Sequence, residues 1–237
     1  FVVALGSRRD WYRYHPLFAE LLRYELRREA PHEVTELRRR AARWYVGHGL
    51  PVDAVQQAVT MRDWGFAAEL IAEHGFGVAL HGQDQGFRDL LDRLPAGAAR
   101  LAPELALLMS SERIASDDGA EASLQLAREQ ERMLADDRRA RFTLILATCR
   151  LLRAGRAGDL DEVLAAGREA LAAHAQLGAG DDMGGVAAAA RAVALSGLGS
   201  AELWSGELDA AEVHLLAGQA AALWAGLDDA RLDCLSA

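Results

Sequence analysis

The chain has 237 residues and a formal net charge of -9, and 51% of its residues are hydrophobic. It contains no lysine, which excludes a P-loop and every mechanism that needs a lysine amine. Residues 1–48 hold ten Arg against six acidic residues, so the negative charge lies in the remainder. This acidic remainder would be repelled by phosphate backbones, and we expect no nucleic-acid binding by this chain on its own.

The N-terminus predicts a strand followed by a helix. Val2–Leu5 is an apolar run closed by glycine, as in the last strand of a small hairpin. Pro16 suits the first position of a helix, because its missing N–H has no intrahelical partner there. One apolar face then repeats at helical spacing through Leu17, Phe18, Leu21, Leu22 and Leu26. A lone strand cannot bury its face, so we expect the chain to be a piece of a longer protein.

Further helices are predicted in order along the chain. Proline or aspartate marks several of their starts, and Gly47 and Gly49 bracket the end of one of them. Four Asp doublets fall between helical patterns, where we expect aspartate to cap the next helix and complement its dipole. The expected segments are His32 to Gly47, Pro51 through Val59, a helix capped by Asp63, Gln85 to Leu94, and Leu101 to Ile114.

Three sequence stretches carry a resemblance to a known family: Trp11 to Leu22, Leu37 to Tyr45, and His48 to Ala58. Their order and spacing resemble the middle of the large ATP-binding LuxR-family transcriptional regulators, of which the maltose-regulator type is the best known. The close match covers roughly residues 10–72. Members of this family combine a nucleotide-binding module, a winged helix, a superhelical repeat region that senses an inducer, and a C-terminal helix-turn-helix.

The resemblance implies a domain plan and one cofactor contact. Residues 1–30 would end the winged-helix domain, residues 31–115 would form a helical bundle or arm, and residues 116–237 would form a sensor region. His15 matches a winged-helix histidine that reaches the β-phosphate of ADP when the ATPase module is present. ATP or ADP therefore belongs to the full-length protein, and we expect no cofactor in this chain alone. The alternative is that His15 caps its helix or packs against neighbouring tyrosines.

A repeat is visible in the C-terminal half. The segment that starts at Gly158 recurs at Gly206, 48 residues later, which indicates stacked helix pairs. Residues 195–215 also resemble a tetratricopeptide unit, although Glu202 stands where that unit prefers a large apolar residue and Gly218 where it prefers alanine. We therefore expect an all-α fold, a right-handed superhelix of antiparallel helix pairs that is tetratricopeptide-like and preceded by the end of a winged helix.

No constellation for catalysis or metal binding is present. None of the seven histidines forms a His-Glu-x-x-His motif, and no Gly-x-Ser-x-Gly occurs. Cys149 and Cys234 lie in helical patterns and are expected to be small buried hydrophobes in a reduced compartment. We therefore expect no metal site and no enzymatic activity.

The candidate binding surface is the concave face of the repeat region, which the first helix of each pair would line. Trp204 is the leading candidate, because an indole can stack on a sugar ring or an apolar ligand while its N–H donates a hydrogen bond. Ordinary packing between helices is the alternative for Trp204, whereas Trp224 is expected in the core or at an interface with a further repeat. The other candidates are Val193, Ser196, Ser200 and Leu203, with Ile145, Thr148, Leu152 and Arg156 in the earlier unit.

The function implied by the resemblance is that of a signal-sensing and oligomerising region of a transcriptional regulator. Its partners would be a small-molecule inducer or a protein, the ATPase and DNA-binding modules of the same full-length chain, and further copies of itself. The alternative is a protein-binding helical-repeat scaffold without a small-molecule ligand. No signal peptide and no apolar run of about 18 residues is apparent, so we expect a cytoplasmic protein without membrane contact.

Overall fold

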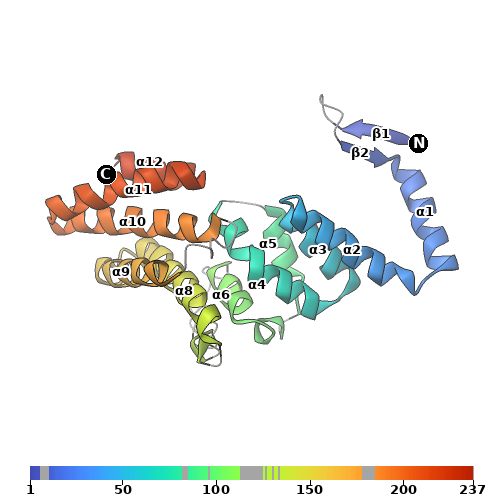
Figure 1. Cartoon of the computed structure of the whole chain (residues 1–237), viewed down its shortest axis with the longest axis horizontal. Helices are drawn as coiled ribbons and strands as arrows, with labels where there is room; N and C mark the ends of the chain where they lie inside the picture. Colours follow the sequence, from blue (N-terminus) through green and yellow to red (C-terminus); the bar gives the residue numbers. More distant parts are fainter. Residues whose placement is uncertain are drawn as a thin grey trace.

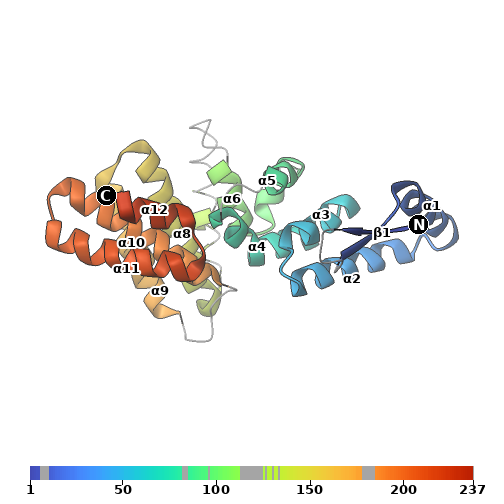
Figure 2. The same cartoon turned by 90° about the horizontal axis from the view of Figure 1, so that it is seen from above.

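The computed structural model describes residues 1–5, 11–81, 85–95, 97–112, 125, 127–129, 131–132, 134–177 and 185–236. A small β-hairpin and one helix form an N-terminal arm, a bundle of short helices follows, and longer antiparallel helices complete the molecule (Figures 1 and 2). The predicted all-α fold is confirmed. Its right-handed superhelical character stays a prediction.

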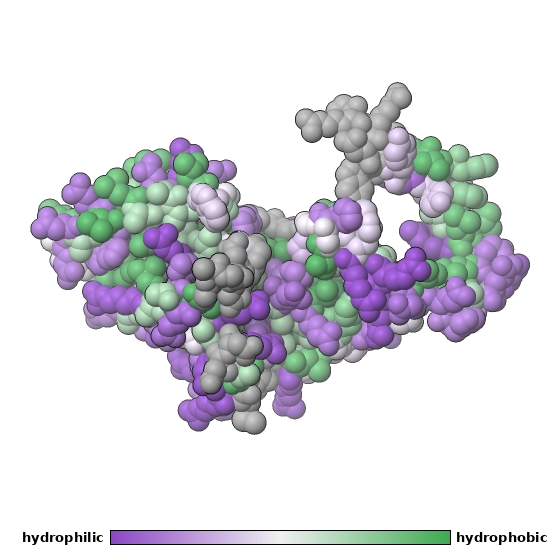
Figure 3. All heavy atoms as spheres, viewed as in Figure 1, coloured by the Kyte–Doolittle hydropathy of each residue, from purple (hydrophilic) through white to green (hydrophobic). Residues whose placement is uncertain are grey.

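The hairpin pairs β1 (Val2–Leu5) with β2 (Trp11–Tyr14) in antiparallel register, Val2 opposite Tyr14. The strand at Val2–Leu5 is thus confirmed, but its predicted place as the last strand of the hairpin is wrong, because the aromatic run after it forms the second strand. Helix α1 (Pro16–Glu29) begins at the predicted proline. None of the residues of α1 is buried, so its apolar face is open to solvent (Figure 3).

The helical bundle follows the predicted start signals closely. Asp63 caps α4, because its carboxylate accepts a hydrogen bond from the backbone N–H of Phe66. Prolines open α3 and α6, and Arg62 ends α3 in the left-handed conformation. The bounds are α2 Glu33–Gly47, α3 Pro51–Met61, α4 Trp64–Leu80, α5 Gln85–Asp92, a 3₁₀ turn η1 Ala98–Arg100, and α6 Pro103–Glu112.

Two helix pairs confirm the predicted 48-residue period. Helix α9 begins at Leu160 and α11 begins at Leu208, each after an αL glycine that ends the preceding helix. Helix α10 packs against α8, α9, α11 and α12, so it is the central element of this half. The bounds are α8 Asp136–Ala157, α9 Leu160–Gln176, α10 Val186–Ser205, α11 Leu208–Ala225 and α12 Asp228–Ser236.

The Asp doublets do not all act as predicted. The pair at 136–137 lies inside α8, whose N-cap is Ala135 without a side-chain hydrogen bond. The pair at 228–229 lies in the first turn of α12, where the carboxylates complement the helix dipole. The pairs at 117–118 and 181–182, and the expected boundary at 115–116, lie outside the described residues.

The core is continuous from α2 to α10, with a second cluster between α10, α11 and α12. Glu104 of α6 is buried and accepts two hydrogen bonds from Arg138 of α8, at 3.0 and 2.9 Å. This pair joins the bundle to the repeat half. Cys149 is buried in α8, as predicted, and burial raises the pKa of its thiol to about 12, whereas Cys234 is only half-buried.

Helix α10 is the one helix, among the residues the structure describes, that is long and apolar enough by length and composition to cross a membrane. In this fold 67% of its most apolar window is buried inside the protein. Core helices satisfy the same test, and the packing of α10 on five neighbouring helices identifies it as one of them.

Candidate ligand-binding groove

A groove of about 1010 Å³ runs over α10. Helices α8 and α12 both pack against α10, one on each side of it (Figure 1). The C-terminal end of α4 also reaches the groove, through Ala79, Leu80 and His81. Helices α8, α10 and α12 therefore share one surface. The tetratricopeptide-like character of this region stays a prediction.

Seven of the nine candidate residues proposed from the sequence line this cavity. Bringing them together requires α8 and α10 to lie side by side, which the 48-residue period predicted and the structure shows. Their role in ligand binding stays a prediction. The seven are Leu152, Arg156, Val193, Ser196, Ser200, Leu203 and Trp204.

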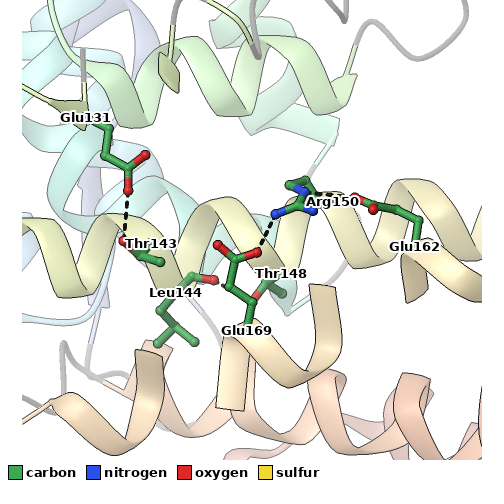
Figure 4. Close-up of polar contacts among 7 residues, drawn as sticks. All are labelled: Glu131, Thr143, Leu144, Thr148, Arg150, Glu162 and Glu169. Carbon is green, nitrogen blue, oxygen red and sulfur yellow. Dashed lines mark hydrogen bonds and ion pairs between the residues drawn. The ribbon is translucent and has the colours of Figure 1, made fainter. Parts of the chain in front are cut away.

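Thr148 is wrong as a contact residue. It is fully buried in α8, and its hydroxyl donates a 2.8 Å hydrogen bond to the carbonyl oxygen of Leu144 (Figure 4). The helical spacing placed it one turn before Leu152, but packing of α8 against its neighbours covers that turn. Ile145, the other candidate on this helix, is buried in the core as well.

The wall formed by α8 is held rigidly to α9. The guanidinium of Arg150 donates to Glu162 at 2.8 Å and also binds Glu169 (Figure 4). Both carboxylates come from α9, and the Arg150 side chain is only 19% exposed. The position of Leu152 and Arg156, which follow on the same helix, is therefore fixed by this ion pair.

Two hydroxyls face the groove without a partner. Ser196 and Ser200 are one helical turn apart on α10, and neither side chain makes a hydrogen bond with another described residue. Ser196 is only 5% exposed, and what remains accessible opens into the groove. A hydroxyl that lines a groove without a protein partner has unused donor and acceptor capacity, which a ligand can satisfy.

Sequence reasoning missed the acidic wall. Asp228, Asp229 and Asp233 of α12 line the groove. The Asp228–Asp229 doublet was read only as helix capping, since the sequence alone does not place α12 beside α10. Trp224 is 78% exposed, so its expected place in the core is wrong, whereas its place at an interface with a further repeat stays a prediction.

His81 closes one end of the groove. Its ring nitrogens lie 2.8 Å from the carbonyl oxygen of Gly77 and 3.1 Å from that of Ala225, at the end of α11. The second contact spans 144 residues of sequence and links the bundle to the last helix pair. No sequence signal pointed to this histidine.

His15 is the N-terminal cap residue of α1, yet its side chain makes no capping hydrogen bond. Its backbone N–H donates to the carbonyl oxygen of Phe1 at 2.7 Å. The imidazole is exposed, and α1, which His15 precedes, lies at the opposite end of the molecule from α10 (Figure 1). The predicted helix-capping alternative is therefore wrong for the side chain, and the ADP contact stays a prediction.

Comparison with known proteins finds a matching family and similar transcriptional regulators. Residues 1–34 match the MalT winged helix domain family. The HTH-type transcriptional regulator MalT of Yersinia pestis (strain Pestoides F) is 29% identical over 110 residues, which is 46% of this chain and 12% of that regulator. The HTH-type transcriptional regulator MalT of Klebsiella pneumoniae (strain 342) is 27% identical over 133 residues, 56% of this chain and 15% of that regulator.

No solved structure gives a significant match. The aligned region spans about an eighth of the length of the regulators it matches, and the family match is confined to the hairpin, α1 and the start of α2. The resemblance drawn from the residues around His15 is thus supported by the family match over residues 1–34, and the similarity to MalT regulators agrees with it. The chain is similar to a fragment of a MalT-like transcriptional regulator, with a MalT-type winged helix end at its N-terminus.

Proposed function

We propose that the chain is a signal-sensing region of a MalT-like transcriptional regulator and that the groove over α10 receives the signal. The observation that carries this proposal is the groove itself: residues of α8 and α10 selected by the resemblance to tetratricopeptide groove positions converge on one cavity. The similarity to MalT supports the regulator context.

The signal acts by population shift in this proposal. An inducer or protein partner favours one of two arrangements of the helical region against the ATPase module, by no more than its difference in affinity for the two. His15 contacts ADP only when that module is present. DNA binding, ATP switching and oligomerisation belong to the full-length cytoplasmic regulator, and the region itself is not an enzyme.

A thermal-shift screen tests the proposal. Sugars, nucleotides, amino acids and common metabolites are each added at millimolar concentration, because a ligand at 100 times its dissociation constant stabilises the fold by about 2.7 kcal/mol. We expect a hit that Trp204→Ala abolishes. Trp224→Ala is the matched control, since Trp224 is equally exposed but lies outside the groove. A hit that survives Trp204→Ala, or one lost equally in both variants, would place the site elsewhere.

The second candidate is a protein-binding scaffold. The indole of Trp204 is 80% exposed at the edge of the groove, whereas small-molecule sites cover most of the ligand surface. An exposed aromatic beside a long groove suits a peptide that lies along it. If no metabolite shifts the melting temperature in the screen and a peptide binds the chain, this candidate is favoured.

A further inference from the structure

The groove holds charges that the fold leaves unpaired. Asp228, Asp229 and Asp233 make no ion pair and no side-chain hydrogen bond with another described residue. Arg156, on α8 at the other side of α10, has no partner among the described residues either. The groove lining therefore holds three free carboxylates along α12 and one free guanidinium, and Arg88 of α5 lines it as well.

These carboxylates do not point to a metal. Among the described residues, no group of three or more His, Cys, Asp or Glu side chains converges closely enough to hold an ion. All three aspartates are exposed and spread over more than one turn of α12, so they suit a ligand whose positive charges are spaced along its length.

Apolar side chains make up much of the rest of the lining, beside Arg88 and His81. Leu152, Leu203 and Trp204 contribute hydrophobic surface, and Trp204 stays largely exposed at the rim. Such a surface, beside a row of carboxylates, matches a segment that alternates apolar and cationic side chains. The unpartnered hydroxyls of Ser196 and Ser200 lie one turn apart between the two walls, where they can hydrogen-bond the amides of that segment.

We infer that the groove binds a protein segment carrying arginine or lysine together with large apolar side chains. The cationic groups lie against Asp228, Asp229 and Asp233, and an apolar side chain packs on Trp204 and Leu203. The hydroxyl of Ser196 hydrogen-bonds the backbone of the bound segment. This inference deepens the proposed function and rests on it, because it names the chemical class of the partner at the same groove.

Binding of synthetic peptides to the 237-residue chain tests the inference. The probe is a capped peptide of about twelve residues that repeats Arg-Leu-Gly-Ser, a length that spans a helical-repeat groove in extended form. One matched peptide carries Glu in place of Arg, and another carries Ser in place of Leu. Affinity is measured by fluorescence anisotropy at physiological salt, where long-range attraction between exposed charges is largely screened.

Two protein variants with an equal change of net charge distinguish binding in the groove from general electrostatic attraction to an acidic protein. The groove variant combines Asp229→Asn with Asp233→Asn. The control combines Asp209→Asn with Glu212→Gln, two exposed acids of α11 outside the groove. We expect the Arg-Leu peptide to bind, the groove variant to weaken it about tenfold, and the control to leave it unchanged. The Glu-Leu and Arg-Ser peptides should bind at least tenfold more weakly.

An equal loss of peptide affinity in the groove variant and the control variant would show only general electrostatic attraction, and it would overturn the inference. Absence of peptide binding at millimolar concentration would overturn it as well. If the peptide does not bind while a metabolite stabilises the chain through Trp204, the inference is wrong and the proposed function stands. If neither the peptide nor a metabolite binds, the inference and the proposed function are both wrong. All substituted positions are exposed, and an unchanged melting temperature confirms that each variant is folded.

Discussion

At the scale of single residues, Glu202 of α10 is the most unusual side chain in the repeat half. It is 3% exposed, and its carboxylate lies 2.6 Å from Nδ1 of His214 on α11. A buried carboxylate is costly unless it is paired. The departure from the tetratricopeptide pattern at Glu202 is thus explained, because His214 on the second helix of the pair supplies the partner.

We expect His214→Ala to lower the free energy of unfolding by about 1–3 kcal/mol, because Glu202 would stay buried without its partner. Urea unfolding measures the change. His32→Ala is the control, since its side chain is 79% exposed and 3.8 Å from Glu33, and it should stay within about 0.5 kcal/mol.

A double variant with leucine at both positions sharpens this prediction. Replacing a buried pair by apolar side chains is often neutral or stabilising. Glu202→Leu with His214→Leu should therefore lose less stability than His214→Ala alone. A larger loss in the double variant would show that packing at these positions, and not the ion pair, sets their contribution.

The groove residues show how far sequence reasoning reaches at this scale. Ser196, Ser200 and Trp204 were predictable, because residues four apart on one helix share a face. Asp228 and Asp233 were not, because their place in the groove depends on how α12 packs against α10, and local spacing carries no such information. Thr148 failed for the same reason, since a helix face can turn into the core within one turn.

At the scale of elements, glycines set the distance between helices. Gly199 of α10 faces Leu215 of α11, and an added Cβ would lie 2.6 Å from Cγ of Leu215 and 3.0 Å from its backbone nitrogen. Gly155 of α8 has nothing within 4 Å of the same position. The first glycine allows close contact between two helices, and the second lies in open space.

Alanine at these two glycines should therefore act in opposite directions. Gly199→Ala must separate α10 from α11, and we expect a loss of about 1–3 kcal/mol in the free energy of unfolding. Gly155→Ala should gain about 0.5–1 kcal/mol, since alanine has the higher helix propensity. Urea unfolding of both variants gives the sign of each change in the free energy of unfolding. A gain for Gly199→Ala would show that α10 and α11 are farther apart than the structure places them.

Asp63 links three elements of the bundle. It caps α4, and Arg39 of α2 donates to its carboxylate at 3.1 and 2.5 Å. The hydrogen bond from Arg39 is the main reason that the pKa of Asp63 lies below its ordinary value, and the Phe66 N–H lowers it further, although partial burial opposes both. Because the folded state binds the proton less readily, this carboxylate stabilises the fold above its ordinary pKa and loses that effect as pH falls.

We expect Asp63→Asn to remove part of the acid sensitivity of the fold. The stability of the unmodified chain should fall as pH drops below about 4, through the lowered pKa of Asp63, and the variant should fall less steeply. The urea midpoint measured from neutral to acidic pH gives the slope. Asp53→Asn, at an exposed acid of α3, is the control and should keep the original slope. Identical slopes for all three proteins would contradict the role of Asp63.

At the scale of the whole molecule, helix boundaries and the repeat were predictable, but the arrangement of the halves was not. Proline, aspartate and glycine mark helix ends locally, and the 48-residue period predicts stacking. The contacts that join distant parts, such as Glu104 with Arg138 and His81 with the end of α11, leave no local pattern. They appear only when the chain is folded.

The N-terminal arm of β1, β2 and α1 is the part with the least support from the rest of the fold. Helix α1 has no buried residue, Leu17 is 73% exposed, and the arm projects away from the bundle (Figures 1 and 2). Helix α10, by contrast, is buried along most of its length. Local opening requires little free energy where few apolar contacts are lost, so the two helices should differ widely in stability.

Hydrogen exchange followed by mass spectrometry tests this difference. In the 237-residue chain, we expect the amides of α1 to exchange at close to the rate of an unstructured peptide. Those of α10 should exchange only through global unfolding, because a marginal helix without packed neighbours opens far more often than a core helix. Helix α4, buried in the bundle, is the internal control and should resemble α10. Slow exchange in α1 equal to that in α4 would show that the arm is held by contacts beyond those of its own hairpin, as it would be if its apolar face were covered by a second copy of the chain.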